Sequence, residues 1–145
     1  MTRIIGIARK LKKRAPMETL GSVLVTLEKG VEGDFRGKPG KRQITVLSQS
    51  AWDLACSEIG VELDWTNRRA NILVDDINLK NSDGKLLEIG EVELLVTQET
   101  DPCERMEEVH TGLFATLAKD WRGGVCCRVI KPGEIRLGDK VKLRD

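Results

Sequence analysis

Short apolar segments separated by turn residues make up most of this chain. Fourteen glycines and four prolines divide it so often that few segments have the length of a helix. Strand-like patterns occupy residues 3–9, 20–27, 43–47, 71–74, 91–97, 125–130 and 140–143. In the fifth of these, Val92, Leu94 and Val96 fall on one face of the strand, as in a half-buried sheet. Many short strands with frequent turns predict a mostly β, barrel-like domain.

Helices form a minor part of the predicted fold, with one or two short ones expected. The clearest runs over residues 50–59, with Ser48 or Ser50 as its N-cap and Gly60 as its stop. Its apolar face combines Trp52, Ala55, Cys56 and Ile59 at helical spacing. A second short helical piece is predicted around residues 112–119.

Length and charge set limits on the class of protein. At 145 residues the chain corresponds to a single domain, residues 1–145. Its 24 basic and 23 acidic residues nearly cancel, and with five aromatic residues it has little material for stacking bases, so we expect no nucleic-acid role. No apolar run approaches the ~20 residues of a membrane span, and the N-terminus does not resemble a secretory signal. We therefore expect a cytoplasmic protein without a membrane partner.

Four cysteines and one histidine are the soft metal-binding groups of the chain. Cys126 and Cys127 are adjacent, so on a strand they point to opposite faces and are poorly placed to pair. No CxxC spacing occurs, which argues against a structural zinc site, and we expect free thiols. Cys56 is predicted to lie in the core, and His110 to lie on the surface.

Cys103 is the candidate reactive thiol. It follows Pro102 in a polar stretch, and Arg105 and Arg122 are the cations expected to stabilise its thiolate. A thiolate acts as a nucleophile or as a metal ligand. The alternative is a loop cysteine without a chemical role.

Two basic segments are candidate anion sites. Residues 30–42 form a glycine-rich loop that carries Arg36, Lys38, Lys41 and Arg42, which suits a phosphate or a carboxylate. The spacing is not that of a P-loop, and a solvated hairpin loop is the alternative. In residues 67–71, Arg69 or Asn71 is a candidate for orienting a ligand, against the alternative of a polar lead into the next strand.

Several stretches taken together resemble the MOSC domain, the C-terminal domain type of molybdenum cofactor sulfurases. The matching segments are residues 31–34, 42–48, 69–74, 87–90, 102–103, 128–129 and 133–139. In many relatives a histidine follows the segment that ends at Asp34. Here Phe35 and Arg36 follow it, so any role of that histidine does not carry over.

The resemblance implies a mostly β fold, a MOSC-like β-barrel, and a role in molybdenum cofactor or sulfur chemistry. It identifies Cys103 as the motif cysteine, with Cys126 and Cys127 as fallbacks. The cofactor-binding candidates are then Arg36, Lys38, Arg42, Arg69, Asn71, Arg105 and Arg122. No pyridoxal phosphate is expected in this chain, although a pyridoxal-phosphate cysteine desulfurase is an implied partner.

Three functions follow as alternatives. The first is a sulfur carrier or transfer domain that uses Cys103 and is loaded by a cysteine desulfurase. The second is a domain that binds the molybdenum cofactor (molybdopterin) within a reductase or a cofactor-handling system, with Cys103 as a ligand of molybdenum and a molybdoenzyme as partner. The third is a non-catalytic β-barrel adaptor. Whether the chain is itself an enzyme, for example a sulfurtransferase, stays open.

Overall fold

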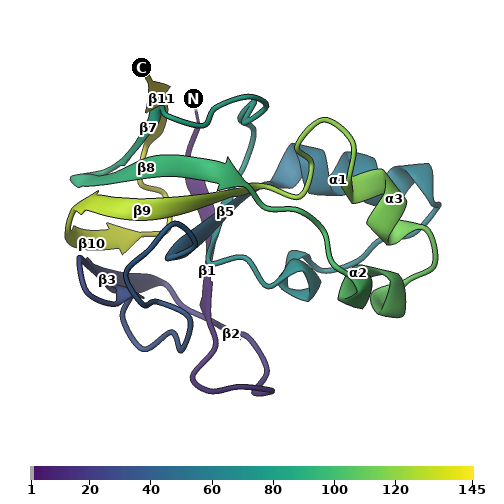
Figure 1. Ribbon diagram of the computed structural model, residues 1–145, viewed down its shortest axis with the longest axis horizontal. Coiled ribbons are helices and arrows are strands. Elements are labelled where there is room, and N and C mark those ends of the chain that lie inside the picture. Colours follow the sequence, from purple (N-terminus) through teal and green to yellow (C-terminus); the bar gives the residue numbers. More distant parts are fainter. Residues whose placement is uncertain (1) are drawn as a thin grey trace.

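Strands form most of the regular structure in the computed structural model, which describes residues 2–145 (Figure 1). The strands are β1 (Ile4–Arg9), β2 (Glu18–Thr19), β3 (Ser22–Thr26), β4 (Gly30–Val31), β5 (Ile44–Ser48), β6 (Ile72–Val74), β7 (Leu86–Ile89), β8 (Val92–Glu99), β9 (Val125–Lys131), β10 (Gly133–Arg136) and β11 (Val141–Arg144). The helices are α1 (Gln49–Glu58), α2 (Glu104–Val109) and α3 (Leu113–Leu117), with a 3₁₀ turn η1 (Trp65–Arg68). The predicted mostly β class is therefore confirmed.

The strands form two sheets, neither of which closes. The larger sheet has the order β11-β7-β8-β9-β5-β6-β1-β2, and the smaller has the order β10-β3-β4. An isolated bridge joins Arg3 to Lys140, between the leading ends of β1 and β11, but no ladder continues from it. The barrel expected from the sequence is thus not formed by continuous pairing among residues 2–145, because β11 and β2 remain the two edges of the large sheet.

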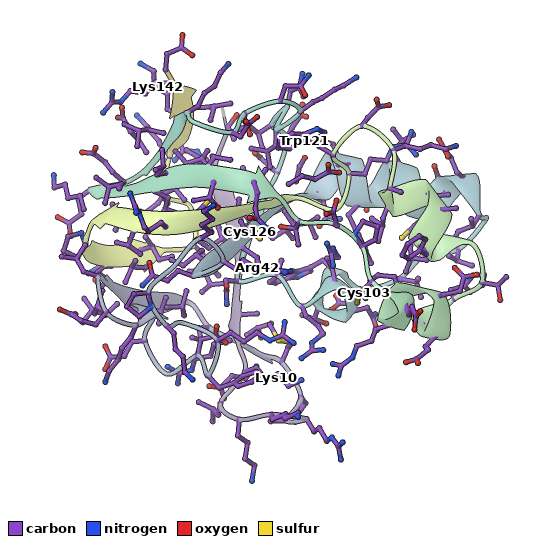
Figure 2. The ribbon with its side chains drawn as sticks, viewed as in Figure 1. Lys10, Arg42, Cys103, Trp121, Cys126 and Lys142 are labelled. Carbon is purple, nitrogen blue, oxygen red and sulfur yellow. The ribbon has the colours of Figure 1, made fainter. Side chains whose placement is uncertain are left out.

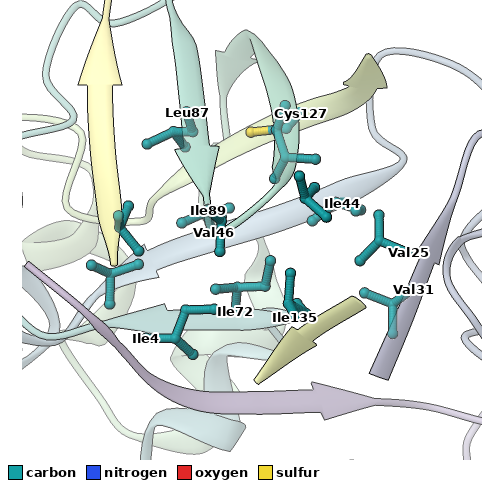
Figure 3. Packing of buried hydrophobic residues seen from close by; sticks show 14 of the residues in the cluster. Ile4, Val25, Val31, Ile44, Val46, Ile72, Leu87, Ile89, Cys127 and Ile135 are labelled. Atoms are coloured by element: carbon teal, nitrogen blue, oxygen red, sulfur yellow. The ribbon is translucent and has the colours of Figure 1, made fainter. Parts of the chain in front are cut away.

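The main core lies between the two sheets (Figure 3). Val25 and Val31 of the small sheet pack in one cluster with Ile44 and Ile72 of the large one. Strand alternation produces this core: along β8 the residues predicted to share one face, Val92, Leu94 and Val96, are buried, and the residues between them are not. Each fully buried aliphatic side chain contributes about 1.5–3 kcal/mol.

A second core lies under the helices, on the right of Figure 1. The predicted helix forms as α1; the Ser48 side chain caps it by accepting from the Ala51 amide, and Ile59 is the C-cap. Trp52, Ala55 and Cys56 are buried as predicted. The indole of Trp52 donates to the carbonyl of Leu63 at 2.8 Å, which satisfies its buried N–H.

Only β5 and β6 run parallel in the large sheet, and their connection sets the position of the candidate site. The chain leaves β5, crosses through α1 and η1, and returns to β6. The residues just before β6 therefore lie beside the end of β1, which pairs antiparallel with β6 through Ile7 and Ile72. Segments far apart in the sequence therefore meet at one end of these inner strands.

One helix of the structure agrees with the sequence prediction and another does not. Helix α3 forms within the predicted 112–119 region, but α2 forms where only a loop was expected, directly after Cys103. A six-residue helix is too short to be stable by itself. Met106, which is 1% exposed, fixes it by packing into the helical core beside Leu113.

Candidate functional site

A cavity of about 560 Å³ opens where β1 and β8 end and β6 begins. Its lining combines residues from four segments: Lys10 and Met17; Asp34, Phe35, Arg36, Lys38, Arg42, Gln43 and Thr45; Arg68, Arg69, Ala70 and Asn71; and Thr100, Asp101, Cys103, Arg105 and Met106, with Gly123. Figure 2 shows Arg42 near the centre of the molecule, Cys103 to its right beside α2, and Lys10 below them. The volume of the cavity lies within the range of small-molecule sites.

The cavity concentrates positive charge that the chain as a whole does not have. Seven basic and two acidic residues line it, whereas the complete chain has 24 basic and 23 acidic residues. Within residues 2–145, the ion pairs all form elsewhere, and none includes a basic residue of the cavity. Cations gathered without carboxylate partners create a field that attracts an anionic ligand.

Hydrogen bonds hold the basic loop in place. The buried Gln43 donates from Nε2 to the carbonyl oxygens of Leu27 (2.8 Å) and Gly37 (3.2 Å), and its Oε1 accepts from the Val129 amide at 3.0 Å. Gly37 is itself required, because a Cβ there would collide with the carbonyl oxygen of Lys29. The loop that carries Arg36, Lys38 and Arg42 is therefore an ordered wall of the cavity and not a freely solvated hairpin.

Lys10 is a cavity residue that the sequence reasoning missed. Its side chain is 7% exposed, and its ammonium lies 5.8 Å from the ring centroid of Phe35. The Lys10 amide donates to the Asp34 carboxylate at 2.9 Å, and its carbonyl accepts from the Phe35 amide at 2.8 Å. Burial lowers the pKa of Lys10, and the positive charges of Arg69, Arg36 and Arg105 lower it further.

Residues 68–71 divide into positioning and cavity-facing side chains. Arg68, also missed by the sequence reasoning, is buried and donates to the carbonyl oxygens of Gly123 (3.0 Å) and Thr100 (2.8 Å). Asn71 is structural as well: its Oδ1 accepts from the Thr45 amide at 3.0 Å, and its Nδ2 donates to the Ala8 carbonyl at 3.2 Å. These bonds join the segments that surround the cavity.

The side chain of Arg69 faces the cavity and, unlike those of Arg68 and Asn71, is not held by a structural hydrogen bond in the described residues. It ends η1 in the left-handed conformation, at φ 67°. Its guanidinium lines the cavity without an ion pair. Burial lowers the pKa of Arg69, and Arg36 and Arg105 add like-charge repulsion to this effect. An anion bound between these side chains would relieve that repulsion.

Cys103 is the exposed cysteine of the cavity wall. It occupies the N-cap position of α2, and Arg105 lies within the same helix. Its sulfur is near enough to act electrostatically on both Arg68 and Arg69. Cys103 therefore lies near Arg68 and Arg69, whereas Arg122, one of the two cations suggested by the sequence, pairs with Glu58.

The other cysteines are buried. The Cys126 thiol lies 3.2 Å from the Thr100 hydroxyl, within hydrogen-bonding distance, and Cys127 packs in the main core. Burial strongly raises the pKa of Cys127, and burial also raises that of Cys56. Neither of the fallback positions presents a thiol to the cavity, since Cys126 and Cys127 are both 0% exposed. His110 lies outside the cavity, where its Nδ1 is 2.9 Å from the Thr111 carbonyl.

Arg122 does not belong to this site. Its guanidinium turns toward α1, where Nη2 pairs with Glu58 at 2.9 Å and Nη1 donates to the Thr116 carbonyl at 3.2 Å. The double glycine after it serves backbone packing: a Cβ on Gly124 would lie 2.3 Å from the Val46 carbonyl oxygen. Of the predicted cofactor-binding residues, all except Arg122 line the cavity.

Two further features are absent from the part of the chain that the structure describes. Residues 2–145 contain no group of three or more histidine, cysteine, aspartate or glutamate side chains placed to hold a metal ion. They also contain no helix of the length and apolarity needed to cross a membrane.

The fold and the site define a small, mostly β domain with a cation-lined cavity and one accessible thiol. The sequence model of the MOSC domain matches residues 9–142. The chain therefore belongs to the MOSC domain family, which is associated with molybdenum cofactor sulfurases.

Solved structures agree in fold. The YuaD protein from Bacillus subtilis is 19% identical, with a TM-score of 0.80 over 99% of this chain and 96% of that one. YiiM from Geobacillus stearothermophilus is 16% identical, with a TM-score of 0.77 over 100% of this chain and 76% of that one. YiiM from Escherichia coli is 18% identical, with a TM-score of 0.71 over 99% and 70%. A comparison with curated proteins found no match.

Proposed function

We propose that this domain binds the molybdenum cofactor in the cation-lined cavity and presents Cys103 to it. The observation that carries the proposal is the group of cavity cations that have no carboxylate partner, in a chain whose net charge is only +1. Molybdopterin carries a phosphate, and Arg36, Arg42, Arg69 and Arg105 are of the residue type that binds phosphate through paired N–H donors.

The residues present fit such a group. The cavity volume of about 560 Å³ suits a small organic ligand. Cys103 offers a soft thiolate on the same wall, and Met17, Phe35 and Met106 add apolar and polarisable surface against which a ring system can lie. When bound, the cofactor would supply a redox-active, sulfur-ligated molybdenum. The protein's own part is to bind the phosphate, orient the ring and bring the thiol near.

The experiment is to measure molybdenum and pterin per chain after anaerobic purification from cells that make the cofactor. Wild type is compared with Cys103→Ala and with Cys126→Ala as the matched control. Loss of molybdenum in Cys103→Ala alone supports a ligand role for Cys103. Retention of metal and pterin in every variant would show that Cys103 is not needed for cofactor binding. Absence of both from wild type would contradict the proposal that the domain binds the cofactor.

A sulfur-carrier function is the second candidate, and the exposure of Cys103 beside Arg69 and Arg105 favours it. In this function the Cys103 thiolate attacks the outer sulfur of a persulfide on a cysteine desulfurase. The sulfur–sulfur bond of the donor breaks, and the donor cysteine leaves as a thiolate. The cavity cations would then stabilise the terminal sulfur anion of the new persulfide.

Mass spectrometry separates this function from cofactor binding. After treatment with a cysteine desulfurase and free cysteine, a carrier gains the mass of one sulfur on the peptide that contains Cys103. The gain should be absent from Cys103→Ala and present in Cys126→Ala. An unchanged mass in wild type would contradict the carrier function.

A further inference from the structure

A second cavity adjoins the first. It has a volume of about 550 Å³ and shares Lys10, Met17, Arg69, Arg105 and Met106 with the first cavity. Its own lining adds Arg14, Ala15, Pro16, Thr66, Asn67, Glu108 and Val109. The two cavities are therefore neighbouring compartments with a common wall, and the second, which we name the outer compartment, lies between residues 14–17 and the facing surfaces of η1 and α2.

The common wall is where the charge is concentrated. Lys10, Arg69 and Arg105 are the cations that line both compartments, and none of the three has an ion pair among residues 2–145. Lys10 as a residue is 7% exposed, and its ammonium lies 5.8 Å from the ring centroid of Phe35 at this junction. The three charges are close enough that Arg69 and Arg105 lower the pKa of Lys10, and Arg105 also lowers that of Arg69. A phosphate at this wall would therefore lie in their combined positive field.

The outer compartment is mixed in character. Pro16, Met17 and Val109 give it apolar surface, and Thr66 and Asn67 give it polar groups. The Asn67 Nδ2 donates to the Asp64 carbonyl at 2.9 Å, which leaves its side-chain oxygen as an acceptor that faces no bonded partner in the described residues. Arg14 and Glu108 add charged groups, so this compartment is slightly more polar than apolar. Apolar surface beside polar groups can contact the rings and hydroxyl groups of an organic ligand, which a bare anion lacks.

We propose that the ligand's phosphate lies at the wall formed by Lys10, Arg69 and Arg105, and that the outer compartment binds an organic group attached beyond that phosphate. The ligand class is then an organic diphosphate or phosphodiester, with a group in each compartment. Molybdopterin itself ends in a monophosphate and would leave the outer compartment unused. The ligand proposed here is therefore a derivative that carries a further organic group joined through that phosphate. This inference rests on the proposed function, because it extends the anion site assigned there.

The test uses purified protein and two kinds of probe, with affinities measured by isothermal titration calorimetry. Inorganic pyrophosphate reports on the wall alone, whereas ADP, CDP and GDP add an organic group to the same anion. Burial of about 60 Å² of apolar ligand surface corresponds to roughly tenfold in Kd. At least one nucleoside diphosphate should therefore bind about tenfold tighter than pyrophosphate.

Ala15→Trp fills the outer compartment, and Ala115→Trp, on an exposed part of α3 outside both cavities, is the matched control. Ala15→Trp should abolish the preference for the nucleoside diphosphate and leave the Kd for pyrophosphate unchanged; Ala115→Trp should change neither. Equal binding of both probes by wild type, or a preference that survives Ala15→Trp, would overturn the inference while leaving the anion site intact. Failure of pyrophosphate itself to bind would overturn the anion site as well.

Discussion

The guanidinium of Arg68 donates from Nη2 to the carbonyl oxygen of Thr100 over 2.8 Å. This bond joins η1 to the segment that leads from β8 to Cys103, and the Arg68 Nε bond to Gly123 joins the same arginine to the start of β9. Arg68 is 8% exposed, so these carbonyls have little access to water as an alternative partner. The position of the thiol therefore depends on a buried side chain that does not itself need to touch a ligand.

Replacing Arg68 should lower stability more than replacing its neighbour. Arg68→Met leaves buried carbonyl oxygens without donors, and we expect a loss of about 2–4 kcal/mol in the free energy of unfolding. Arg69→Met is the matched control, because it removes the same side chain without breaking a hydrogen bond seen in the structure. Urea unfolding measures both, and equal midpoints for the two variants would contradict the role given to Arg68.

Lys10→Met should be more stable than wild type near neutral pH. Burial and the neighbouring arginines lower the pKa of Lys10 below its ordinary 10.5, so the folded protein is destabilised wherever this amine is charged. That penalty fades as pH rises from the lowered pKa toward 10.5, since the unfolded chain then binds the extra proton. The advantage of Lys10→Met, measured by urea unfolding, should therefore be larger at about pH 7 than at about pH 10.

The same variant should weaken anion binding, because it removes a cation from the common wall of the two compartments. Lys12→Met, at an exposed position in the same basic stretch, is the control. If Lys10→Met lowered stability at neutral pH, or if its advantage over wild type did not change with pH, the electrostatic account of Lys10 would be wrong.

Cys103 should be the first cysteine alkylated in the folded protein. It is exposed, whereas Cys56, Cys126 and Cys127 are buried and burial raises the pKa of Cys56 and Cys127. Under native conditions iodoacetamide should modify Cys103 at least about tenfold faster than the other three, and unfolding in urea should remove the difference. Peptide mass spectrometry measures the labelling of each cysteine. Faster labelling of Cys126 than of Cys103 in the folded protein would contradict the prediction and make Cys126 the candidate reactive thiol.

Gly124 should tolerate alanine poorly, for a reason that can be separated from backbone strain. Gly124 and Gly84 have similar positive φ angles of 91° and 87°, so a side chain at either costs about 1–2 kcal/mol. At Gly124 the added Cβ also meets the Val46 carbonyl oxygen at 2.3 Å, whereas at Gly84 nothing lies within 4 Å. Gly124→Ala should therefore unfold at clearly lower temperature than Gly84→Ala, and equal melting temperatures would contradict the close packing of β5 against this turn.

The main helix and seven of the strands were predictable because their patterns are local, whereas β2, β4, β7 and β10 were not predicted as strands. Val92, Leu94 and Val96 show their shared face through alternation alone, and Ser48 and Gly60 bracket α1 with capping chemistry that needs no tertiary contact. Helix α2 was not predictable in this way. Its six residues hold a helical shape only because Met106 packs into a core supplied by other segments.

The sequence predicted the types of residue in the candidate site, but not which individual residues line it. The basic loop at residues 30–42 and Cys103 could be selected as candidates from local composition, and both line the cavity. Lys10 was missed because it lies in a run of cations, residues 9–14, and only the pairing of β1 with β6 decides which of them faces the cavity. Arg122 was a candidate because of its neighbours in sequence, but it does not line the cavity, since it pairs with Glu58 on α1.

The most direct test of the account is the pterin content of a charge-depleted cavity. Arg69→Gln/Arg105→Gln removes two cavity cations, and Arg128→Gln/Lys142→Gln removes two exposed cations that line neither compartment, with Lys142 visible far from the cavity in Figure 2. After anaerobic purification from cofactor-producing cells, wild type and the second variant should retain equal molybdenum and pterin, and the first should lose both. Equal retention by the two variants would contradict the claim that the cavity holds the cofactor through its unpaired cations.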